Sequence, residues 1–406
     1  MSAFFEVSEI TETVALIRTA SGVTLTFPSA LTVIDRVCAC EAGANPSESA
    51  RASREVRVMS AVVGRARYLR IGLVSLNGCE KGNKWENSQV TIISHCTVEA
   101  LARAANTLRD GKLVIFPTET VYGVGADAEN ASAVARIYEI KGRPRNHPVI
   151  VHIASLRELE YWIDSIPEYA LALARNFWPG SMTLILPRSK HAGDFLTGGQ
   201  ENVGIRIPSH PLALKLLEEF HLLGGRGVAA PSANLFGRVS PTTAQAAEEQ
   251  LGPRLADDEV ILDGGPCLVG IESTVIDCTS DSPRILRPGA ITEEMIEEAT
   301  SLQLVEREDA IRASGLLENH YAPHARVLVS ESGSDGAGFL ALADIQTPPR
   351  HTRLASPKTI EEYARVLYSA LREADSRGLS EIVIVPPPGD GIAIAICDRI
   401  EKARSK

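Results

Sequence analysis

Residues 113–153 decide the fold: LVIFPTETVYGVGADAENASAVARIYEIKGRPRNHPVIVHI. They begin with Leu113-Val114-Ile115-Phe116, an apolar, β-branched run short enough for a buried strand, which a proline ends. Thr118-Glu119-Thr120 then brings two hydroxyls and a carboxylate to the strand's carboxyl end, where open α/β sheets bind ligands. A helix is expected next, and Lys141 and Arg143 follow it. The stretch therefore predicts a ligand-binding α/β protein.

The composition excludes several classes of protein. The chain has 406 residues, 44% of them hydrophobic, which is enough for two or three domains. Its net charge of -10 argues against an extended nucleic-acid-binding surface, but it allows a local basic pocket for a small anion. No apolar run approaches the ~18 residues of a membrane span, and no signal peptide is evident. Seven scattered cysteines without CxxC spacing suggest neither a zinc site nor a disulfide framework, so we expect a reducing, cytoplasmic location without membrane contact.

The first 90 residues differ from the rest, with a net charge of +1 against -11 for the remainder. Residues 23–27 could form a strand, whereas residues 42–54 are typical of a loop or a disordered segment. Residues 1–92 are interpreted as a poorly ordered extension, translated from a start codon placed too far upstream; a small accessory domain is the alternative. The Thr97-Val98-Glu99-Ala100 segment looks like the natural first-helix start of an enzyme.

From residue 97 onward, helices and strands alternate, with glycine and proline between them. Helices are expected at 97–109, 131–140, 167–177, 211–220, 243–251 and 292–299, and strands at 113–116, 149–153, 182–186, 203–208 and 272–277. A further strand of small residues is expected to start at residue 227 and to break into a turn before residue 234, and residues 284–289 are expected to close the domain. The last 80 residues repeat a smaller pattern, with strands at 326–329, 338–343 and 382–385 and helices at 359–376 and 391–403. These patterns predict a larger α/β domain followed by a Rossmann-like one.

Basic residues suggest a nucleotide pocket. Lys141 and Arg143 lie at a helix end, where a solvated cap is the simpler interpretation. A lysine beside an arginine also suits triphosphate recognition, and Arg206 and Arg287 could join them from other strand ends. The sequence contains neither a GxxxxGK[ST] loop nor a GxGxxG fingerprint, so another architecture would have to hold the nucleotide.

Other polar positions have two interpretations each. His152 closes an apolar strand, where a buried structural histidine and a functional one are both plausible. Ser232 and Asn234 could simply form a turn, since both residue types bond their own backbone. Ser273 lacks a G-x-S-x-G context, so nucleophilic hydrolysis has little support.

Eight ordered motifs together resemble the YrdC-type threonylcarbamoyl-AMP synthases in their long, two-domain form. The motifs are PTETVYGVGADA (117–128), KGRP (141–144), VHI (151–153), VGIRIP (203–208), APSAN (230–234), GIESTVID (270–277), LRPG (286–289) and HYAP (320–323). The resemblance implies a twisted, mixed YrdC-like sheet with a concave basic cavity at 93–299, a connecting segment over the active site at 300–325, and a smaller Rossmann-like α/β domain at 326–406.

The resemblance implies an enzyme that condenses L-threonine, bicarbonate and ATP into threonylcarbamoyl-adenylate and pyrophosphate, for tRNA modification by a downstream threonylcarbamoyl transferase complex. Lys141 and Arg143 would be catalytic. Threonine and carbamate would be held by Thr120, His152, Arg206, Ser232 and Ser273, with Arg206 clamping the carboxylate through two nitrogens. ATP would be held by Lys141, Arg143, His147, Asn202, Asn234, Thr242, Arg287, His320 and Tyr321. Mg²⁺ would arrive with ATP, without a metal site or organic cofactor in the protein, and a weak contact with double-stranded RNA is a further implied partner.

Three positions depart from the family pattern. His147 stands where asparagine is usual and Asn202 where threonine is usual, and both can still hydrogen-bond, so we expect altered affinity with retained activity. Ala313 replaces part of a common Ser-Pro-Gly and is expected to loosen the connecting segment. Two rivals are considered. A non-catalytic RNA-binding or regulatory module disagrees with the acidity of the chain, and a multidomain carbamoyl-transfer enzyme would need zinc-finger-like cysteine pairs, which are missing.

Overall fold

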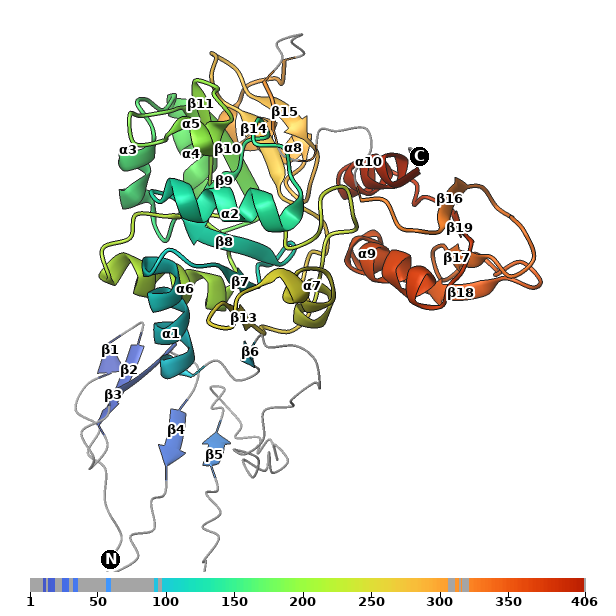
Figure 1. The fold of residues 1–406 in the computed structure, drawn as a ribbon, viewed down its shortest axis with the longest axis horizontal. Coiled ribbons are helices and arrows are strands. Elements are labelled where there is room, and N and C mark those ends of the chain that lie inside the picture. The colour runs from blue at the N-terminus through green and yellow to red at the C-terminus, as the bar shows by residue number, and fades with distance from the viewer. Residues whose placement is uncertain are drawn as a thin grey trace, which may run out of the picture. The chain divides into compact units, whose positions relative to one another are not determined.

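The computed structural model describes residues 91–93, 97–305, 311–313, 315 and 321–404, together with the backbone of five short strands between residues 10 and 59 (Figure 1). The chain divides into two compact units, Met1–Asn83 and Lys84–Lys406. All of the predicted site residues belong to the second unit. Each unit is described by itself.

The first unit contains short antiparallel strands. Its elements are β1 (Ile10–Thr11), β2 (Val14–Arg18) and β3 (Thr24–Pro28), which form one sheet, and the pair β4 (Thr32–Asp35) and β5 (Val56–Met59). The strand expected at residues 23–27 is therefore confirmed as β3. The loop expected at 42–54 lies outside the described residues, as does most of the predicted extension.

A ten-stranded mixed sheet organises the larger part of the second unit. In spatial order its strands are β15 (Arg284–Arg287), β14 (Thr274–Asp277), β10 (Met182–Pro187), β11 (Asn202–Arg206), β9 (Ile150–His152), β12 (Val228–Ala229), β8 (Gly123–Asp127), β7 (Val114–Phe116), β13 (Val260–Leu262) and β6 (Thr91–Ile93). Parallel and antiparallel pairs are mixed: β9 and β11 are parallel, for example, whereas β7 and β8 are antiparallel. The expected mixed α/β architecture is confirmed.

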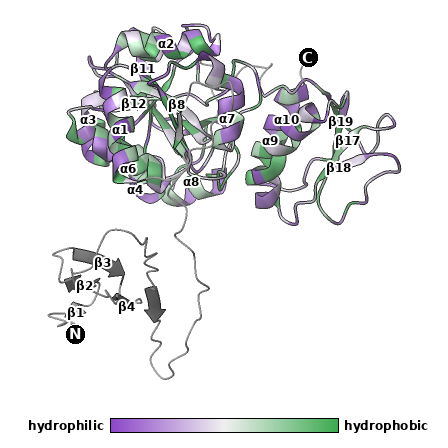
Figure 2. Cartoon of the chain, turned by 60° about the horizontal axis from the view of Figure 1, so that its bottom comes forward, coloured by the Kyte–Doolittle hydropathy of each residue, from purple (hydrophilic) through white to green (hydrophobic). Residues whose placement is uncertain are grey.

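Helices cover both faces of this sheet. They are α1 (Val98–Arg109), α2 (Ala131–Lys141), α3 (Leu159–Trp162), α4 (Glu168–Phe177), α5 (Asp194–Thr197), α6 (Pro211–Leu222), α7 (Ala244–Leu251) and α8 (Glu293–Thr300), with 3-10 turns η1 (Leu156–Glu158) and η2 (Gly252–Arg254). Because side chains alternate along a strand, Ile115 packs into the cluster that contains α2, whereas Phe116 packs with α1 and α6. Figure 1 shows α2 and α6 on opposite sides of β8. Hydrophobic and hydrophilic residues occur together on helices such as α4 and α6 (Figure 2), as one-sided burial requires.

The predicted helix starts are confirmed by their caps. The Thr97 side chain accepts a hydrogen bond from Ala100 N at 3.2 Å, and Thr243 and Thr292 accept equivalent bonds at the starts of α7 and α8. A left-handed Gly142, with φ 63°, ends α2. That conformation favours glycine, so the glycine at position 142 specifies the turn that leads to Arg143.

The C-terminal part forms a separate parallel sheet of four strands, in agreement with the Rossmann-like domain predicted there. In spatial order they are β16 (Arg326–Val329), β19 (Glu381–Ile384), β17 (Gly338–Leu340) and β18 (Thr352–Ala355), accompanied by α9 (Ile360–Ser376) and α10 (Ile392–Arg404). The edge strand β18 has no counterpart among the predicted strands. All four of its residues are half-buried, so it lacks the apolar run that marks a central strand.

Loops of the larger sheet make hydrophobic contacts with the C-terminal part of the second unit. One cluster contains Val121 and Ile271 from the larger sheet's loops together with Tyr321, Tyr363 and Leu367, the last two from α9. The apolar face of α9 therefore packs both on its own sheet and on the loops that surround the candidate site. None of the described helices is long and apolar enough to cross a lipid bilayer.

Candidate active site

A cavity lies among the loop after β7, the ends of β9 and β11, the loop after β12 and the segment that leads into β14. Its lining residues are Thr118, Thr120, Val121, Gly123, Arg143, Ile150, His152, Arg206, Ala230, Pro231, Ser232, Glu272, Ser273, Arg287, Gly315 and Tyr321. Most of the predicted site residues meet here. Those that line the cavity are Thr120, Arg143, His152, Arg206, Ser232, Ser273, Arg287 and Tyr321.

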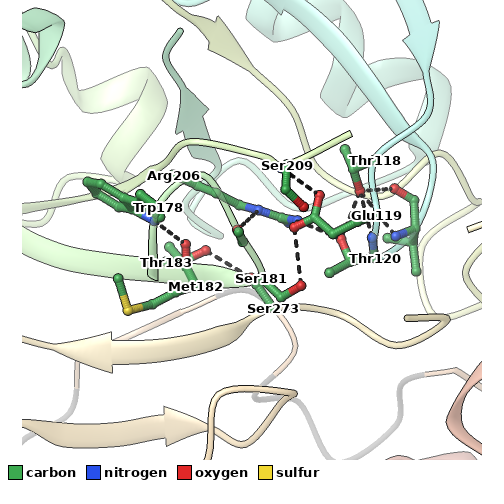
Figure 3. A network of polar contacts seen from close by, with 12 residues as sticks. Thr118, Glu119, Thr120, Trp178, Ser181, Met182, Thr183, Arg206, Ser209 and Ser273 are labelled. Carbon is green, nitrogen blue, oxygen red and sulfur yellow. Dashed lines mark hydrogen bonds and ion pairs between the residues drawn. The ribbon is translucent and has the colours of Figure 1, made fainter. Parts of the chain in front are cut away.

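Arg206, at the end of β11, forms the centre of one wall (Figure 3). Its Nη2 donates to Glu119 Oε1 at 2.6 Å and to Thr120 Oγ1 at 2.9 Å, while its Nε donates to the Gly180 carbonyl oxygen at 3.3 Å. Both hydrogens of Nη2 are thus engaged. Nη1 takes part in none of these three hydrogen bonds and is the nitrogen suited to a bound anion.

Glu119 is the buried counter-ion of this wall, with 4% of its surface exposed. Burial raises its pKa, but the charge and hydrogen bonds of Arg206 and the Ser209 backbone N–H outweigh burial, so that the net pKa is lowered. Ser181 Oγ donates to the same carboxylate at 3.2 Å. Glu119 is therefore a carboxylate that fixes Arg206, a role that sequence analysis did not assign to it.

His152 contributes a neutral imidazole to the cavity. Burial, followed by the charge of Arg206, lowers its pKa to about 3. Its Nδ1 is buried and has no hydrogen-bond partner among the described residues, and the ring meets Phe116 edge to face with centroids 6.1 Å apart. A buried polar atom without a partner is costly, so Nδ1 is suited to a hydrogen bond with a bound molecule.

Lys141, expected to be catalytic and to bind ATP, is not among the residues that line the cavity. Its side chain is buried, and its Nζ donates to the backbone carbonyls of Ser232 and Asn234. Burial, and then the neighbouring Arg143, lower its pKa well below the usual value. In this arrangement Lys141 ties the end of α2 to the loop after β12 and so positions Ser232.

Arg143 does line the cavity. It is 7% exposed, and its Nη2 donates to the Pro148 carbonyl oxygen at 2.9 Å. Burial lowers its pKa to about 10, with opposing effects from Tyr138 and Tyr321. The guanidinium therefore remains a cation near neutral pH, as the interpretation of this residue as an anion-binding group requires.

Ser273 and Arg287 form a second polar group. Arg287 donates through Nε and Nη2 to the Ser273 carbonyl oxygen, at 3.1 and 2.9 Å, and through Nη2 to Ser273 Oγ at 3.1 Å. Ser273 Oγ also shares a hydrogen bond of 2.8 Å with Thr183 Oγ1. Strand pairing between β10 and β14 sets this contact, because Thr183 and Val275 are register partners beside it.

Besides Lys141, four described residues expected to bind ATP do not line the cavity: His147, Asn202, Asn234 and Thr242. Asn234 donates to the carbonyls of Leu235 and Arg238, and its buried Oδ1 has no partner among the described residues. Thr242 Oγ1 accepts a hydrogen bond of 2.7 Å from Arg372 of α9. His147 packs edge to face on Phe236, and Asn202 begins β11.

The connecting segment reaches the cavity through Gly315 and Tyr321; His320 lies outside the described residues. Gly315 has φ +85°, and a Cβ there would come within 2.6 Å of Tyr321 Oη and 2.9 Å of Arg287 Nη1. Glycine is thus required both by the backbone and by the space. Ala313, the departure from the family pattern, is buried and packs against Ile185 and Val275.

Sequence reasoning missed Glu272, which lines the cavity and is 6% exposed. Its carboxylate accepts hydrogen bonds from Ser240 Oγ and Tyr368 Oη, both at 2.7 Å, and from Arg399 Nε at 2.9 Å. Burial raises its pKa, but Arg399 and Arg287 overcome this and bring the pKa to about 2. One indication of this role was present in the sequence, the carboxylate inside the GIEST motif. Nothing in the sequence indicated that Tyr368 of α9 and Arg399 of α10 would be its partners.

Two family profiles match the chain. One, described as "Telomere recombination" and covering the Sua5, YciO and YrdC proteins, matches residues 106–289, and the other, "Threonylcarbamoyl-AMP synthase, C-terminal domain", matches residues 291–405. Together they span both sheets of the second unit.

Curated relatives and a solved structure agree with these profiles. The threonylcarbamoyl-AMP synthases of Pyrococcus abyssi and Bacillus subtilis are each 40% identical to this chain, covering 74% and 75% of it and 92% of each relative. The Schizosaccharomyces pombe protein of the same name is 33% identical over 79% of this chain and 92% of its own length. The crystal structure of P. abyssi Sua5 complexed with L-threonine superposes with a TM-score of 0.70 at 37% identity, covering 78% of this chain and 98% of that one. The chain therefore belongs to the threonylcarbamoyl-AMP synthase family, in the long form that carries a C-terminal domain.

Proposed function

We propose that this chain condenses L-threonine, bicarbonate and ATP into threonylcarbamoyl-adenylate and pyrophosphate. The observation that carries the proposal is the meeting of Arg206, His152, Arg143 and Arg287 at one cavity in a chain that matches 92% of the length of relatives named for this activity. The product would supply the threonylcarbamoyl group for tRNA modification.

Threonine is proposed to occupy the Arg206 side of the cavity. The related P. abyssi protein was solved with L-threonine, and this wall offers the groups that an amino acid needs. Arg206 Nη1 would meet the carboxylate, while Thr120, Ser232 and the unpartnered Nδ1 of His152 would hydrogen-bond the remaining polar atoms. A neutral His152 accepts or donates without adding charge.

The chemistry requires positioning and charge neutralisation, without a protein nucleophile. The threonine amine attacks bicarbonate, and loss of water gives a carbamate. A carbamate oxygen then attacks the α-phosphorus of ATP, and the bond to pyrophosphate breaks. Arg143 and Arg287, both buried cations of the lining, would offset the charge on the carbamate and phosphates.

The remaining nucleotide contacts belong to the proposal as well. Lys141 would act through the loop that it positions, and the Oδ1 of Asn234 would accept a hydrogen bond from the nucleotide. The other residues proposed around ATP are His147, Asn202, Thr242, His320 and Tyr321.

The described residues offer Mg²⁺ no ligand set of their own. No group of three or more His, Cys, Asp or Glu side chains that could hold a metal ion occurs in the described part of the chain. The carboxylate of the cavity wall, Glu272, already bonds Arg399. We therefore propose that Mg²⁺ stays on the ATP phosphates. A cytoplasmic location, delivery to a threonylcarbamoyl transferase complex and a weak RNA contact complete the proposal.

Pyrophosphate release tests the proposed function. Purified protein is given Mg·ATP, bicarbonate and each amino acid in turn, and release is expected with threonine and at background levels with the others. Omission of bicarbonate serves as the control and should abolish release, since no carbamate can form. Release that is independent of threonine or of bicarbonate would refute the proposal.

A further inference from the structure

Arg399 is a fully buried cation that the C-terminal domain brings to the back of the cavity. It lies on α10, has 0% of its surface exposed, and contacts the larger sheet's loops in two places. Its Nε donates to Glu272 Oε2 at 2.9 Å and its Nη2 to the Pro288 carbonyl oxygen at 2.9 Å. A third nitrogen, Nη1, pairs with the adjacent Asp398.

The same guanidinium touches the connecting segment. Its Cζ lies 5.5 Å from the centre of the Tyr321 ring, within the range of a cation–π contact. Tyr321 is itself fully buried and stacks on Tyr368, whose hydroxyl donates to Glu272. Glu272, Tyr321 and Arg399 are therefore one contact group, and two of its members line the cavity.

The charges of this group bear on Arg287. Glu272 is a carboxylate in the wall of a cavity proposed to receive a triphosphate, and Arg287 is the next cation that acts on it after Arg399. With Arg399 present, Arg287 can direct Nε and Nη2 to Ser273. Without Arg399, Glu272 would be a buried, unpaired anion, attracting Arg287 and repelling the nucleotide.

We propose that Arg399 is a positioning residue for ATP: it neutralises Glu272 and supports Tyr321, so that Arg287 stays on Ser273 and available to the phosphates. The inference rests on the proposed function for the identity of the nucleotide. It makes the C-terminal domain part of the ATP-binding wall.

The test compares Arg399→Met, Arg399→Lys and the double variant Arg399→Met/Glu272→Gln with a matched control, Arg353→Met. Arg353 also lies in the C-terminal domain, where it donates to several carbonyls and lies over the Phe339 ring. Its contacts remain within that domain. Thermal unfolding, binding of a non-hydrolysable ATP analogue, and the KM values for ATP and threonine are measured for each variant.

Arg399→Met is expected to weaken analogue binding and raise the KM for ATP by about tenfold, the ratio expected for one charged hydrogen bond. The KM for threonine should change by less than about twofold, within the scatter of distant substitutions. Arg399→Lys, which keeps the charge, should recover part of the loss. The double variant should bind the analogue more tightly than Arg399→Met, because the anion that attracts Arg287 is gone.

An unchanged ATP affinity in folded Arg399→Met, or an equal loss in Arg353→Met, would overturn the inference. Should Arg399→Met fail to fold, the double variant decides, since it removes both charges together: near wild-type affinity supports neutralisation, and a tenfold loss contradicts it. Wild-type protein that binds the analogue but releases no threonine-dependent pyrophosphate would instead refute the proposed function.

Discussion

Two buried arginine–glutamate pairs contribute to the cavity and differ in the parts of the chain that supply them. Arg206 and Glu119, 2.6 Å apart, both come from the larger sheet and its loops (Figure 3). Arg399 and Glu272, 2.9 Å apart, join α10 to the segment before β14. The wall proposed for threonine is thus complete within the larger domain, whereas the wall proposed for ATP needs the C-terminal domain.

The largest expected effect comes from breaking the first pair. Arg206→Met removes the cation proposed for the threonine carboxylate and leaves Glu119 unpaired. Removing one partner of a buried charge pair typically lowers the binding free energy by about 2–5 kcal/mol. Loss of the pair between Arg206 and the threonine carboxylate should therefore lower kcat/KM for threonine on the order of 100-fold. Steady-state kinetics with a thermal melt as the folding control measure this, and an unchanged threonine KM in folded protein would remove Arg206 from the threonine wall.

His152 sharpens the same wall through affinity and pH. His152→Asn removes the ring whose Nδ1 is proposed to bond threonine, so the KM for threonine should rise roughly tenfold, as expected for one hydrogen bond. In the unfolded chain this histidine becomes protonated below its usual pKa of 6.5, whereas in the folded protein its pKa is about 3, so the ring stays neutral to a lower pH. The free energy of unfolding therefore falls as the pH drops through this window.

The pH dependence of stability distinguishes His152 of the threonine wall from Glu272 of the ATP wall. The pKa of Glu272 is depressed from 4.5 to about 2, so its stabilisation is present above pH 4.5 and is lost as the pH falls towards 2. Denaturant titrations between pH 6.5 and 4.5 should show a shallower loss of stability in His152→Asn than in wild type, whereas Glu272→Gln should differ in slope mainly below pH 4.5. Identical slopes for His152→Asn and wild type would show that the folded protein does not hold this ring neutral.

A smaller effect is expected where the connecting segment meets the ATP wall. Gly315→Ala places a Cβ against Tyr321 and Arg287 at a positive φ. The strain should cost about 1 kcal/mol and raise the KM for ATP several-fold while sparing that for threonine. Equal shifts in both KM values would mean that Gly315 does not affect ATP binding more than threonine binding.

The smallest effect is expected from deleting residues 1–83. All the residues that line the cavity belong to the second unit, which has its own hydrophobic clusters. Both KM values should stay within about twofold of wild type, the scatter expected for a change that removes no lining residue. A folded but inactive truncation would show that the first unit serves the reaction.

The sequence predicted the local elements well because their signals are local. Helices begin near residues 97, 243 and 292 as expected, each with a threonine cap, and the apolar run at 113–116 is a buried strand. Strand β8 was missed because two of its five residues are glycines. A Cβ at Gly125 would come within 2.6 Å of Val228 Cγ1, so close packing between strands requires the residue that weakens the strand pattern.

Only those site residues that lie within recognisable sequence motifs could be predicted. Lys141 was expected to contact substrate, but its partners are carbonyls 91 and 93 residues further along the chain. Arg399 lies 127 residues from Glu272, in a helix whose neighbouring Asp398 and Lys402 are typical of a solvated face. Such pairings depend on how domains pack, and no spacing along the chain reveals them.

The most direct test of the central claim is the origin of the carbon between threonine and AMP. Protein supplied with Mg·ATP, threonine and ¹³C-labelled bicarbonate is quenched rapidly, and the adenylate is analysed by mass spectrometry. The proposed chemistry predicts a product that contains threonine, AMP and the labelled carbon. A threonyl-adenylate without the label, or no adenylate at all, would contradict it.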